Sequence, residues 1–400
     1  MPPSQSKIEK LITELCPEGV EFKELGVVCE VADNKRKPIR SDLRAPGKTP
    51  YYGANNIQDY VEGFTHEGEY ILIAEDGSAS LENYSIQYAT GKFWANNHVH
   101  VIRALSEIDN RFLFHYLKDM NFIQFLSGGG RAKLTKTKML TIRIPIPPLA
   151  VQKEIVRMLD SFTELEAELE AELEARKKQY EYYRDELLTF GEGVEFIELD
   201  DVIVSLRTGL NPRQNFKLNP PNGDNYYITV RELNGFNIQT SDKTDRVDDA
   251  GLVLIQNRSK LQVGDVLFSG TGTIGRTAIV SETPVNWNIK EGIYAITPNP
   301  KSIDARFLIH LLHSDKVRRQ IISQSDGSTV SSIPMATLRK VTIPLPSLEE
   351  QNRIVSILDK FDALVNDISI GLPAELEARR KQYEYYRGKL LTFEEKEYAK

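Results

Sequence analysis

Two glycine-rich stretches are the first candidates for chemistry, because they formally match nucleotide-binding motifs. Residues 270–275 read GTGTIG, a match to the dinucleotide fingerprint G-x-G-x-x-G, and they follow the strand-like run DVLF. That fingerprint binds a pyrophosphate only when a helix N-terminus follows the glycines. Here RTAIV and then Pro284 follow, which is a β-like pattern. We therefore predict a glycine-rich hairpin turn rather than a nucleotide site.

Two further stretches resemble motifs of adenine methyltransferases. They are FSGTG at residues 268–272 and NPPN at residues 219–222. The aromatic residue that would stack on a flipped base is missing after NPPN, and no helix pattern follows the glycines. The corresponding turn in the first half of the chain, EDGSAS, has neither feature. We expect no catalytic residue in this chain.

Histidine and carboxylate side chains gather in the first half of the chain. His98 and His100 are two residues apart on a predicted strand, so they would share a face and could be metal ligands. No further Cys, Asp or His cluster completes such a site, so an ordinary polar strand face is the preferred interpretation. Glu75, Asp76 and Glu82 are interpreted as loop carboxylates, and the sequence predicts no metal.

Basic residues with amide neighbours form two sets, one in each half of the chain. Residues 32–148 carry 15 Lys+Arg against 12 Asp+Glu, and residues 206–346 carry 17 against 12, although the whole chain has a net charge of −7. Arg, Lys, Asn and Gln are the side chains that read base edges in the major groove, and basic side chains also contact phosphates. The predicted DNA-binding residues are Lys35, Arg36, Lys37, Arg40, Arg44, Asn96, Asn97, Arg131, Lys133, Lys136 and Lys138 in the first set, and Arg207, Arg213, Gln214, Asn215, Arg231, Asn234 and Arg276 in the second.

A repeated helical segment is the clearest feature of the elements that position these residues. Glu174–Phe190 and Glu377–Phe393 share 14 of 17 positions, including polar ones that folding alone would not retain. Either each copy faces the same partner, or the two copies pack on one another about a local two-fold axis. The predicted partner-docking residues are Lys178, Gln179, Tyr180, Tyr183, Arg184, Lys381, Gln382, Tyr383, Tyr386 and Arg387.

The repeat extends beyond these helices. EGVEFKEL (18–25) returns as EGVEFIEL (192–199), RFLFHYL (111–117) as RFLIHLL (306–312), and IPIPPL (144–149) as IPLPSL (343–348). Short β-like runs separated by turns occupy the rest of each block. Each proline signal marks a boundary before a long helix, because proline is not tolerated inside one.

The first long helix should have an apolar seam that needs a partner. Its expected members are Ile155, Leu159, Phe162, Leu165, Leu169, Leu173, Tyr180, Tyr183 and Leu187. The tract ELEAELEAELEA lies at its centre, and about 40 residues give a rod of about 60 Å. We expect an antiparallel pairing with the second helix, which should kink or break at SIGLP (369–373).

The length and composition are those of an ordinary soluble protein with two domains. Four hundred residues exceed one hydrophobic core. The absence of a long apolar run, of a signal-peptide pattern and of more than two cysteines favours the cytoplasm. The predicted divisions are an N-terminal helix at 1–17, a first β-rich domain at 18–147, a central helical region at 148–190, a second β-rich domain at 191–346, a distal helical region at 347–393 and a tail at 394–400.

In combination, these features resemble the specificity (S, or HsdS) subunits of type I restriction-modification systems, from about Glu18 to Phe393. The features are two divergent β-rich blocks ending in IP-x-P-x-L, then Gln152 or Gln351, and a helix with R-K-Q-Y-x-Y-Y-R-x-x-L-L. The resemblance implies an α+β fold with two similar globular target recognition domains. Two long antiparallel coiled-coil-like helices would join them in a pseudo-two-fold symmetric, circularly organised arrangement.

The resemblance also implies a function. Each recognition domain would read one half of a bipartite double-stranded DNA target, and the helices would set the spacer and dock two modification (methyltransferase) subunits. The ELEA tract resembles tetrapeptide repeats whose number sets the gap between half-sites in one branch of the family. The subunit itself would be non-catalytic and without a cofactor. S-adenosylmethionine would be used by the modification subunits, and ATP with Mg²⁺ by restriction subunits.

Two other classes of function remain open from the residues alone. A bivalent protein adaptor that never contacts DNA would also explain two identical helices on two different blocks. A self-contained adenine methyltransferase would require S-adenosylmethionine binding by the isolated chain. DNA affinity that falls steeply with salt would separate the first alternative from a DNA-binding subunit.

Overall fold

The computed structural model divides the chain into two compact units by its internal contacts. Unit 1 comprises Met1–Glu170 and Leu376–Lys400, and unit 2 comprises Ala171–Glu375. The structure describes residues 7–128, 132–213, 215–325, 331–367 and 369–397. The boundary between the units falls inside the predicted central spacer 148–190, whose residues up to Glu170 belong to unit 1 and those from Ala171 to unit 2.

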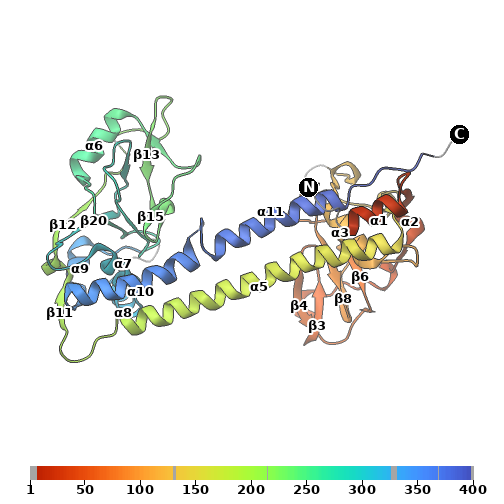
Figure 1. Cartoon of the computed structure of the whole chain (residues 1–400), viewed down its shortest axis with the longest axis horizontal. Coiled ribbons are helices and arrows are strands. Elements are labelled where there is room, and N and C mark those ends of the chain that lie inside the picture. The colour runs from red at the N-terminus through yellow and green to blue at the C-terminus, as the bar shows by residue number, and fades with distance from the viewer. Residues whose placement is uncertain (1–6, 129–131, 214, 326–330, 368, 398–400) are drawn as a thin grey trace. The chain divides into compact units, whose positions relative to one another are not determined.

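Unit 1 combines short strands with helices (Figure 1). Its elements are α1 (Lys7–Leu15), β1 (Glu21–Glu24), α2 (Leu25–Val28), β2 (Cys29–Val31), η1 (Asp33–Lys35), η2 (Ser41–Leu43), β3 (Pro46–Tyr52), β4 (Ile57–Val61), β5 (His66–Glu67), β6 (Tyr70–Ala74), β7 (Ile86–Ala89), β8 (Lys92–Ala95), β9 (Val99–Ala104), α3 (Asn110–Asp119), η3 (Ile123–Phe125), α4 (Lys136–Leu140), β10 (Arg143–Ile146) and the start of α5 (Leu149–Leu187).

Unit 2 is built in the same way and has additional elements. Its elements are the end of α5, then β11 (Glu195–Glu198), η4 (Leu199–Val202), β12 (Ile203–Thr208), β13 (Asn225–Ile228), η5 (Val230–Glu232), β14 (Leu233–Asn234), β15 (Asn237–Ile238), β16 (Arg246–Val247), α6 (Asp249–Ser259), β17 (Val266–Ser269), β18 (Thr277–Ile279), β19 (Trp287–Ile289), β20 (Ile293–Pro298), α7 (Ala305–His313), α8 (Asp315–Ser323), α9 (Met335–Arg339), β21 (Thr342–Leu345) and α10 (Leu348–Asn366).

The two units repeat one strand topology. The order β2-β9-β6-β7 in unit 1 corresponds to β12-β20-β17-β18 in unit 2. A second sheet contains one parallel pair in each unit, β3 with β8 and β13 with β19. The repeated EGVEF segment pairs with the proline strand in both, as Glu21↔Ile146 and Glu195↔Leu345. The sequence repeat therefore encodes a structural repeat.

Equivalent caps begin the short helix of each unit. The Asp109 side chain accepts hydrogen bonds from the backbone N–H groups of Arg111 and Phe112 at the start of α3. Asp304 accepts the same pair of bonds at the start of α7. An aspartate at this position satisfies N–H groups that the helix leaves unpaired. The predicted helices at RFLFHYL and RFLIHLL are confirmed.

The long helices also largely match the sequence expectations. Helix α5 runs unbroken for 39 residues. The second copy breaks as predicted, between α10 and α11 (Leu372–Leu390). In unit 1, α5 and α11 are antiparallel, because Phe162 packs on Tyr386 whereas Glu170 bonds the earlier residue Arg380. One detail differs, because Leu165, expected in the seam, is 44% exposed. The predicted N-terminal helix contains α1 (Lys7–Leu15), and residues 1–6 of that prediction lie outside the described residues.

Each unit has its own hydrophobic core, where its sheet, short helix and long helices meet. In unit 1, Ile155 and Leu159 of α5 and Leu390 of α11 join the core around Phe112. In unit 2, Ile354 and Leu358 of α10 join the core around Phe307 together with Tyr180 and Leu188. In the part of the chain that the structure describes, no helix is long and apolar enough to cross a membrane.

Candidate nucleic-acid and partner-docking sites

In unit 1, the turn after β6 meets the basic loop that precedes α4. Asp76 and Ser127 both form β-bridges with Lys133, and the N–H of Leu134 donates to the carbonyl of Glu75 at 2.8 Å. The Lys133 Nζ lies 2.8 Å from Glu75 Oε1. Two loops that the sequence singled out separately therefore form one surface.

A charged network beneath this surface holds Arg36 in place. Arg36 Nη1 lies 2.7 Å from Glu75 Oε2 and donates to the carbonyl of Val99 at 2.6 Å. His100 is buried and lies 2.7 Å from Asp33. Burial acts to raise the pKa of Asp33, but hydrogen bonds from His100 and the Val101 N–H outweigh it and lower the pKa. Arg36 is therefore engaged within the unit, and His100 is a buried polar residue of its strand that pairs with Asp33.

A shallow depression of about 400 Å³ gathers four of the predicted DNA-binding residues. Its lining includes Arg40, Arg44, Asn96 and Asn97. Arg44 is held over the Tyr51 ring at 4.1 Å from the ring centroid, and Asn96 is buried. Arg40 and Asn97 are exposed, so they are the two members of this group that present polar atoms to a ligand.

The other basic candidates of unit 1 lie around these loops. Those with exposed positions are Lys35, Lys37, Lys136 and Lys138. Lys37 lies 6.0 Å from the centroid of the Trp94 ring. Arg131 falls outside the described residues, so its placement as a DNA contact stays a prediction.

In unit 2, the glycine motif is the predicted hairpin turn. GTGTIG lies between β17 and β18, which pair antiparallel with Phe268↔Thr277. Thr271 at the tip of this turn forms a β-bridge with Ser332, matching the contact between Asp76 and Lys133 in unit 1. Arg276 is exposed and donates to the carbonyl of Val230 at 3.3 Å. A strand follows the glycines, so the turn does not have the geometry of the dinucleotide fingerprint.

The remaining candidates of unit 2 are spread over several surfaces. Arg231 is 2.8 Å from Asp245, and Asn234 is exposed. Arg213 and Asn215 are exposed on the loop before β13, and Gln214 lies outside the described residues. Arg207 is different, because it pairs with the fully buried Asp265 at 2.7 Å. Its guanidinium is engaged inside the unit and is not presented to DNA.

An Arg–Asp–His cluster around a buried histidine, which the sequence reasoning missed, joins the short helix of each unit to a long helix. In unit 1, Asp160 of α5 accepts from Arg111 at 2.9 Å and lies 2.8 Å from His115 Nε2. In unit 2, Asp359 of α10 accepts from Arg306 at 2.5 Å and lies 3.0 Å from His310 Nε2. The signal was present, since all three residue types recur at equivalent positions of the two blocks.

In unit 2, the electrostatics of the cluster favour the ionised form of Asp359. Burial acts to raise the pKa of Asp359, but hydrogen bonds from His310 and Arg306 outweigh it and lower the pKa. Burial lowers the pKa of His115, against the opposing effect of Asp160. A buried glutamine completes each junction: Gln152 donates to the carbonyl of Pro147 at 2.7 Å, and Gln351 donates to that of Pro346 at 2.9 Å.

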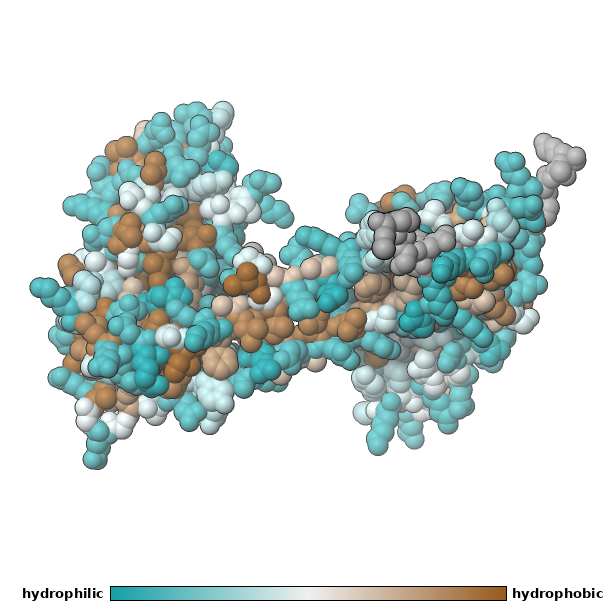
Figure 2. Space-filling model, in the orientation of Figure 1, coloured by the Kyte–Doolittle hydropathy of each residue, from teal (hydrophilic) through white to brown (hydrophobic). Residues whose placement is uncertain are grey.

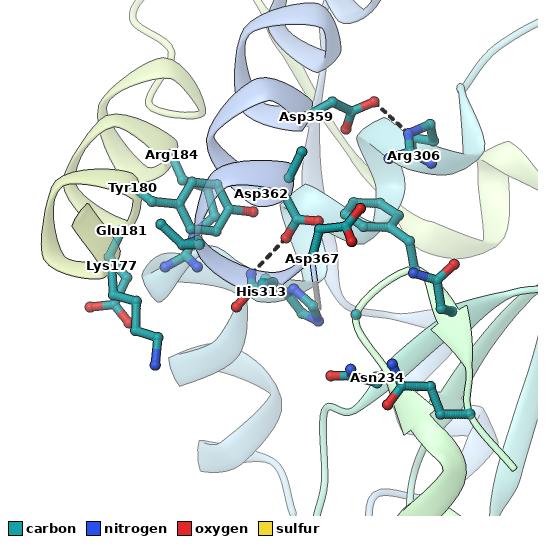
Figure 3. A pocket seen from close by; sticks show the side chains of 17 residues that line it. Lys177, Tyr180, Glu181, Arg184, Asn234, Arg306, His313, Asp359, Asp362 and Asp367 are labelled. Carbon is teal, nitrogen blue, oxygen red and sulfur yellow. Dashed lines mark hydrogen bonds and ion pairs between the residues drawn. The ribbon is translucent and has the colours of Figure 1, made fainter. Parts of the chain in front are cut away.

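A polar pocket of about 460 Å³ lies beside this cluster in unit 2, between α5, α10 and the loop around Asn234. Figure 3 shows Lys177, Tyr180, Glu181 and Arg184 on one helix, opposite Asp359 and Asp362. Burial raises the pKa of Asp362. Among the described residues, no group of three or more His, Cys, Asp or Glu side chains could hold a metal ion.

The repeated helical segment places its predicted docking residues on two faces. Tyr180 is buried and stacks on Phe361, and the guanidinium of Arg184 lies 5.7 Å from the centroid of the Tyr180 ring. Tyr383 and Tyr386 pack on Phe162 in unit 1. Tyr183 also contacts Phe361, and Arg387 pairs with Asp119. These six residues contact side chains of their own units, while Lys178, Lys381 and Gln382 are exposed and Gln179 is half-buried.

The outward face of the repeat contains two tyrosines that the sequence reasoning missed. Tyr182 and its counterpart Tyr385 are each 65% exposed. The exposed residues Lys178 and Glu181 beside Tyr182 recur as Lys381 and Glu384 beside Tyr385. Helical spacing counted from the inward-facing Leu173 and Tyr180 would have separated this outward face from the inward one.

Comparison with known proteins identifies the family. The model of the type I restriction modification DNA specificity domain matches residues 17–175 and 191–378. A Haemophilus influenzae protein named as a type I restriction enzyme specificity subunit is 46% identical over 385 residues, which cover 94% of this chain and 96% of that protein. The Escherichia coli EcoR124I/EcoR124II specificity subunit is 36% identical over 265 residues, which cover 63% of each chain.

Solved structures have the same fold. The crystal structure of the S subunit of a type I restriction-modification system from M. genitalium matches 93% of this chain and 96% of its own length, with a TM-score of 0.57 and 15% identity. A chain from a structure of type I complex assembly matches 94% and 98%, with a TM-score of 0.59 and 20% identity. The chain therefore belongs to the specificity subunits of type I restriction-modification systems, with two DNA specificity domains and a non-catalytic role.

Proposed function

We propose that this chain selects the DNA target of a type I restriction-modification complex, with each recognition domain reading one half of a bipartite, asymmetric site. The observation that carries the proposal is a common frame with different loops. Both units share the four-stranded sheet, the Arg–Asp–His cluster and the glutamine junction. The loops on that frame differ: the turn after β6 is EDGSAS, and the turn after β17 is GTGTIG. A shared frame with different loops suits two ligands that are both DNA half-sites but differ in base sequence.

Exposed polar groups on these loops are the proposed DNA contacts. Arg40, Asn97 and Lys136 of unit 1, and Arg213, Arg231 and Arg276 of unit 2, are exposed. Arginine and asparagine can bond guanine and adenine edges in pairs, and lysine suits phosphates. Arg36 and Arg207 leave the proposed set of base-reading residues because their side chains are only 17% and 16% exposed and are paired with carboxylates of their own units.

We further propose that the outward face of each helical repeat docks one modification subunit. The face comprises Lys178, Glu181 and Tyr182 in one copy and Lys381, Glu384 and Tyr385 in the other. Two identical exposed faces fit two identical partners, and exposed tyrosines are typical anchors of protein interfaces. Figure 2 shows hydrophobic residues at the surface along the helical segments. S-adenosylmethionine would be bound by those partners, and ATP with Mg²⁺ by restriction subunits.

The docking proposal predicts a change in stoichiometry. Tyr182→Ser and Tyr385→Ser should each remove one modification subunit from the reconstituted complex, and the double variant should bind neither. Native mass spectrometry reads this directly. The matched control is Tyr60→Ser, because Tyr60 is 53% exposed on β4 of a recognition domain. Full binding by the double variant would contradict the assignment of this face.

A salt titration tests the DNA proposal against the adaptor alternative. The complex should bind duplex DNA with an affinity that falls steeply as salt increases, because phosphate contacts release counterions. A bivalent adaptor would show no such binding. If the isolated chain bound S-adenosylmethionine, the methyltransferase alternative would replace the proposal.

A further inference from the structure

One arginine of the helical repeat has a carboxylate partner in unit 1 and lacks the equivalent partner in unit 2. Arg387 of α11 lies 2.6 Å from Asp119, at the end of α3. Its counterpart in the repeat is Arg184 of α5. Alignment of RFLFHYLKD with RFLIHLLHS puts Ser314 at the position of Asp119. The carboxylate that neutralises Arg387 therefore has no counterpart beside Arg184.

Arg184 is nevertheless largely buried. Its side chain is 12% exposed, and among the described residues it forms an ion pair with the adjacent Asp185, at 3.4 Å. The other oxygen of Asp185 accepts a hydrogen bond from the backbone N–H of Asp315. The Nε atom of Arg184 is buried and has no hydrogen-bond partner among the described residues. A buried guanidinium with an unsatisfied donor carries a free-energy cost, which a bound anion would remove.

Two more arginines surround the same place. A pocket of about 280 Å³ is lined by Arg184, Arg276, Arg318, His313, Leu312 and the hairpin residues Thr273–Gly275. None of these lining residues is acidic, and within the described part of the chain neither Arg276 nor Arg318 forms an ion pair with a carboxylate. The glycine-rich hairpin turn between β17 and β18 forms one wall of the pocket.

The histidine in this pocket is neutral at physiological pH. Burial, together with the positive charges of Arg184 and Arg318, lowers the pKa of His313 to about 4. Its Nε2 lies 2.9 Å from Thr277 Oγ1. Arg184 and His313 also line the neighbouring pocket of about 460 Å³, where Figure 3 labels both. The positive charge of the pocket therefore comes from the three guanidinium groups.

We propose that this pocket of unit 2 binds a phosphate group through Arg184, Arg276 and Arg318. Guanidinium groups bind phosphate oxygens in pairs and hold their charge at every physiological pH. Given the proposed function, on which this step rests, the phosphate belongs to the backbone of the duplex that unit 2 reads. The equivalent place in the described part of unit 1 differs, because Arg387 is paired with Asp119 and the equivalent turn carries Glu75 and Asp76.

The test compares two variants of the full-length chain that lose equal charge. Arg318→Gln removes a proposed phosphate ligand. Arg319→Gln, the matched control, removes the neighbouring exposed arginine, which is ion-paired with Asp315. Arg276→Gln is a second test variant from a different element. Thermal unfolding is measured in inorganic phosphate and in chloride of equal ionic strength, and duplex DNA binding is measured over a salt series.

Phosphate should raise the unfolding midpoint of the wild type and of Arg319→Gln. The increase should be smaller for Arg318→Gln and Arg276→Gln. Each test variant should also bind duplex DNA about tenfold more weakly, with a salt slope smaller by about 0.9, the value for one lost phosphate contact. A phosphate effect without a DNA effect would identify a site for free phosphate. Equal behaviour of all variants in both assays would overturn the site, while intact DNA binding would leave the proposed function standing.

Discussion

At the residue scale, the same side chain serves different purposes in the two copies of the repeat. Tyr180 and Tyr383 are equivalent in sequence and both face inward, yet Tyr180 meets His310 and Tyr383 meets Phe162. Arg184 and Arg387 diverge further, since only Arg387 has an aspartate from the short helix. Identity of sequence therefore fixes which face of the helix a residue occupies, and the neighbouring block decides what it contacts.

The low pKa of His313 predicts a pH-dependent stability of unit 2. The pKa is about 4 in the folded state and about 6.5 in an unfolded chain. Between these values the unfolded state binds the proton more tightly, so the free energy of unfolding decreases as the pH falls from about 6.5 to about 4. His313→Asn cannot take up that proton and should show a weaker pH dependence.

Urea denaturation in phosphate-free buffer at pH 7.5 and pH 5.0 would measure this difference. The aspartates and glutamates titrate in both proteins, so the comparison with the variant isolates the histidine. An identical loss of stability in the wild type and in His313→Asn would contradict the assignment.

At the element scale, patterns within a single segment were predictable. The hairpin at GTGTIG, the helices at RFLFHYL and RFLIHLL, and the break after α10 all follow from local spacing, glycine and proline. The missed features depend on partners distant in sequence. The Arg111–Asp160 pair joins residues 49 positions apart, and the exposure of Leu165 depends on what α11 leaves uncovered. The helical period alone cannot show which apolar positions of a helix are covered by another helix.

The break between α10 and α11 depends on Gly371. A Cβ atom at this residue would lie 2.4 Å from the carbonyl oxygen of Ala363 and 2.7 Å from that of Leu364. Backbone carbonyls cannot move aside cheaply, so Gly371→Ala should destabilise unit 2 by about 1–3 kcal/mol.

The matched control lies in the helix after the break. At Gly388 an added Cβ would meet nothing within 4 Å, so Gly388→Ala should stabilise the chain by up to about 1 kcal/mol through helix propensity. Chemical denaturation should show a lower free energy of unfolding for Gly371→Ala and an equal or higher one for Gly388→Ala. A harmless Gly371→Ala substitution would show that the break tolerates a side chain.

At the scale of the whole molecule, the ELEA tract is the proposed ruler between the two recognised half-sites. In unit 1, Arg380 bonds both Glu166 and Glu170, which are one repeat apart. One added ELEA unit after Ala175 lengthens α5 by about 6 Å and turns it by only about 40°. The methylated site should keep both half-site sequences and gain one to two base pairs between them, at about 3.4 Å per step. A changed half-site sequence, or an unchanged gap, would rule out the ruler.

The central claim is that two independent recognition domains stand on one repeated frame. It is tested most directly by replacing residues 32–143 with the corresponding block of another specificity subunit, and by sequencing methylated adenines in cells that also express the modification subunit. Because the contacts of that block lie within unit 1, we predict a new sequence in one half-site, an unchanged sequence in the other and the same gap. A simultaneous change in both half-sites would contradict the account.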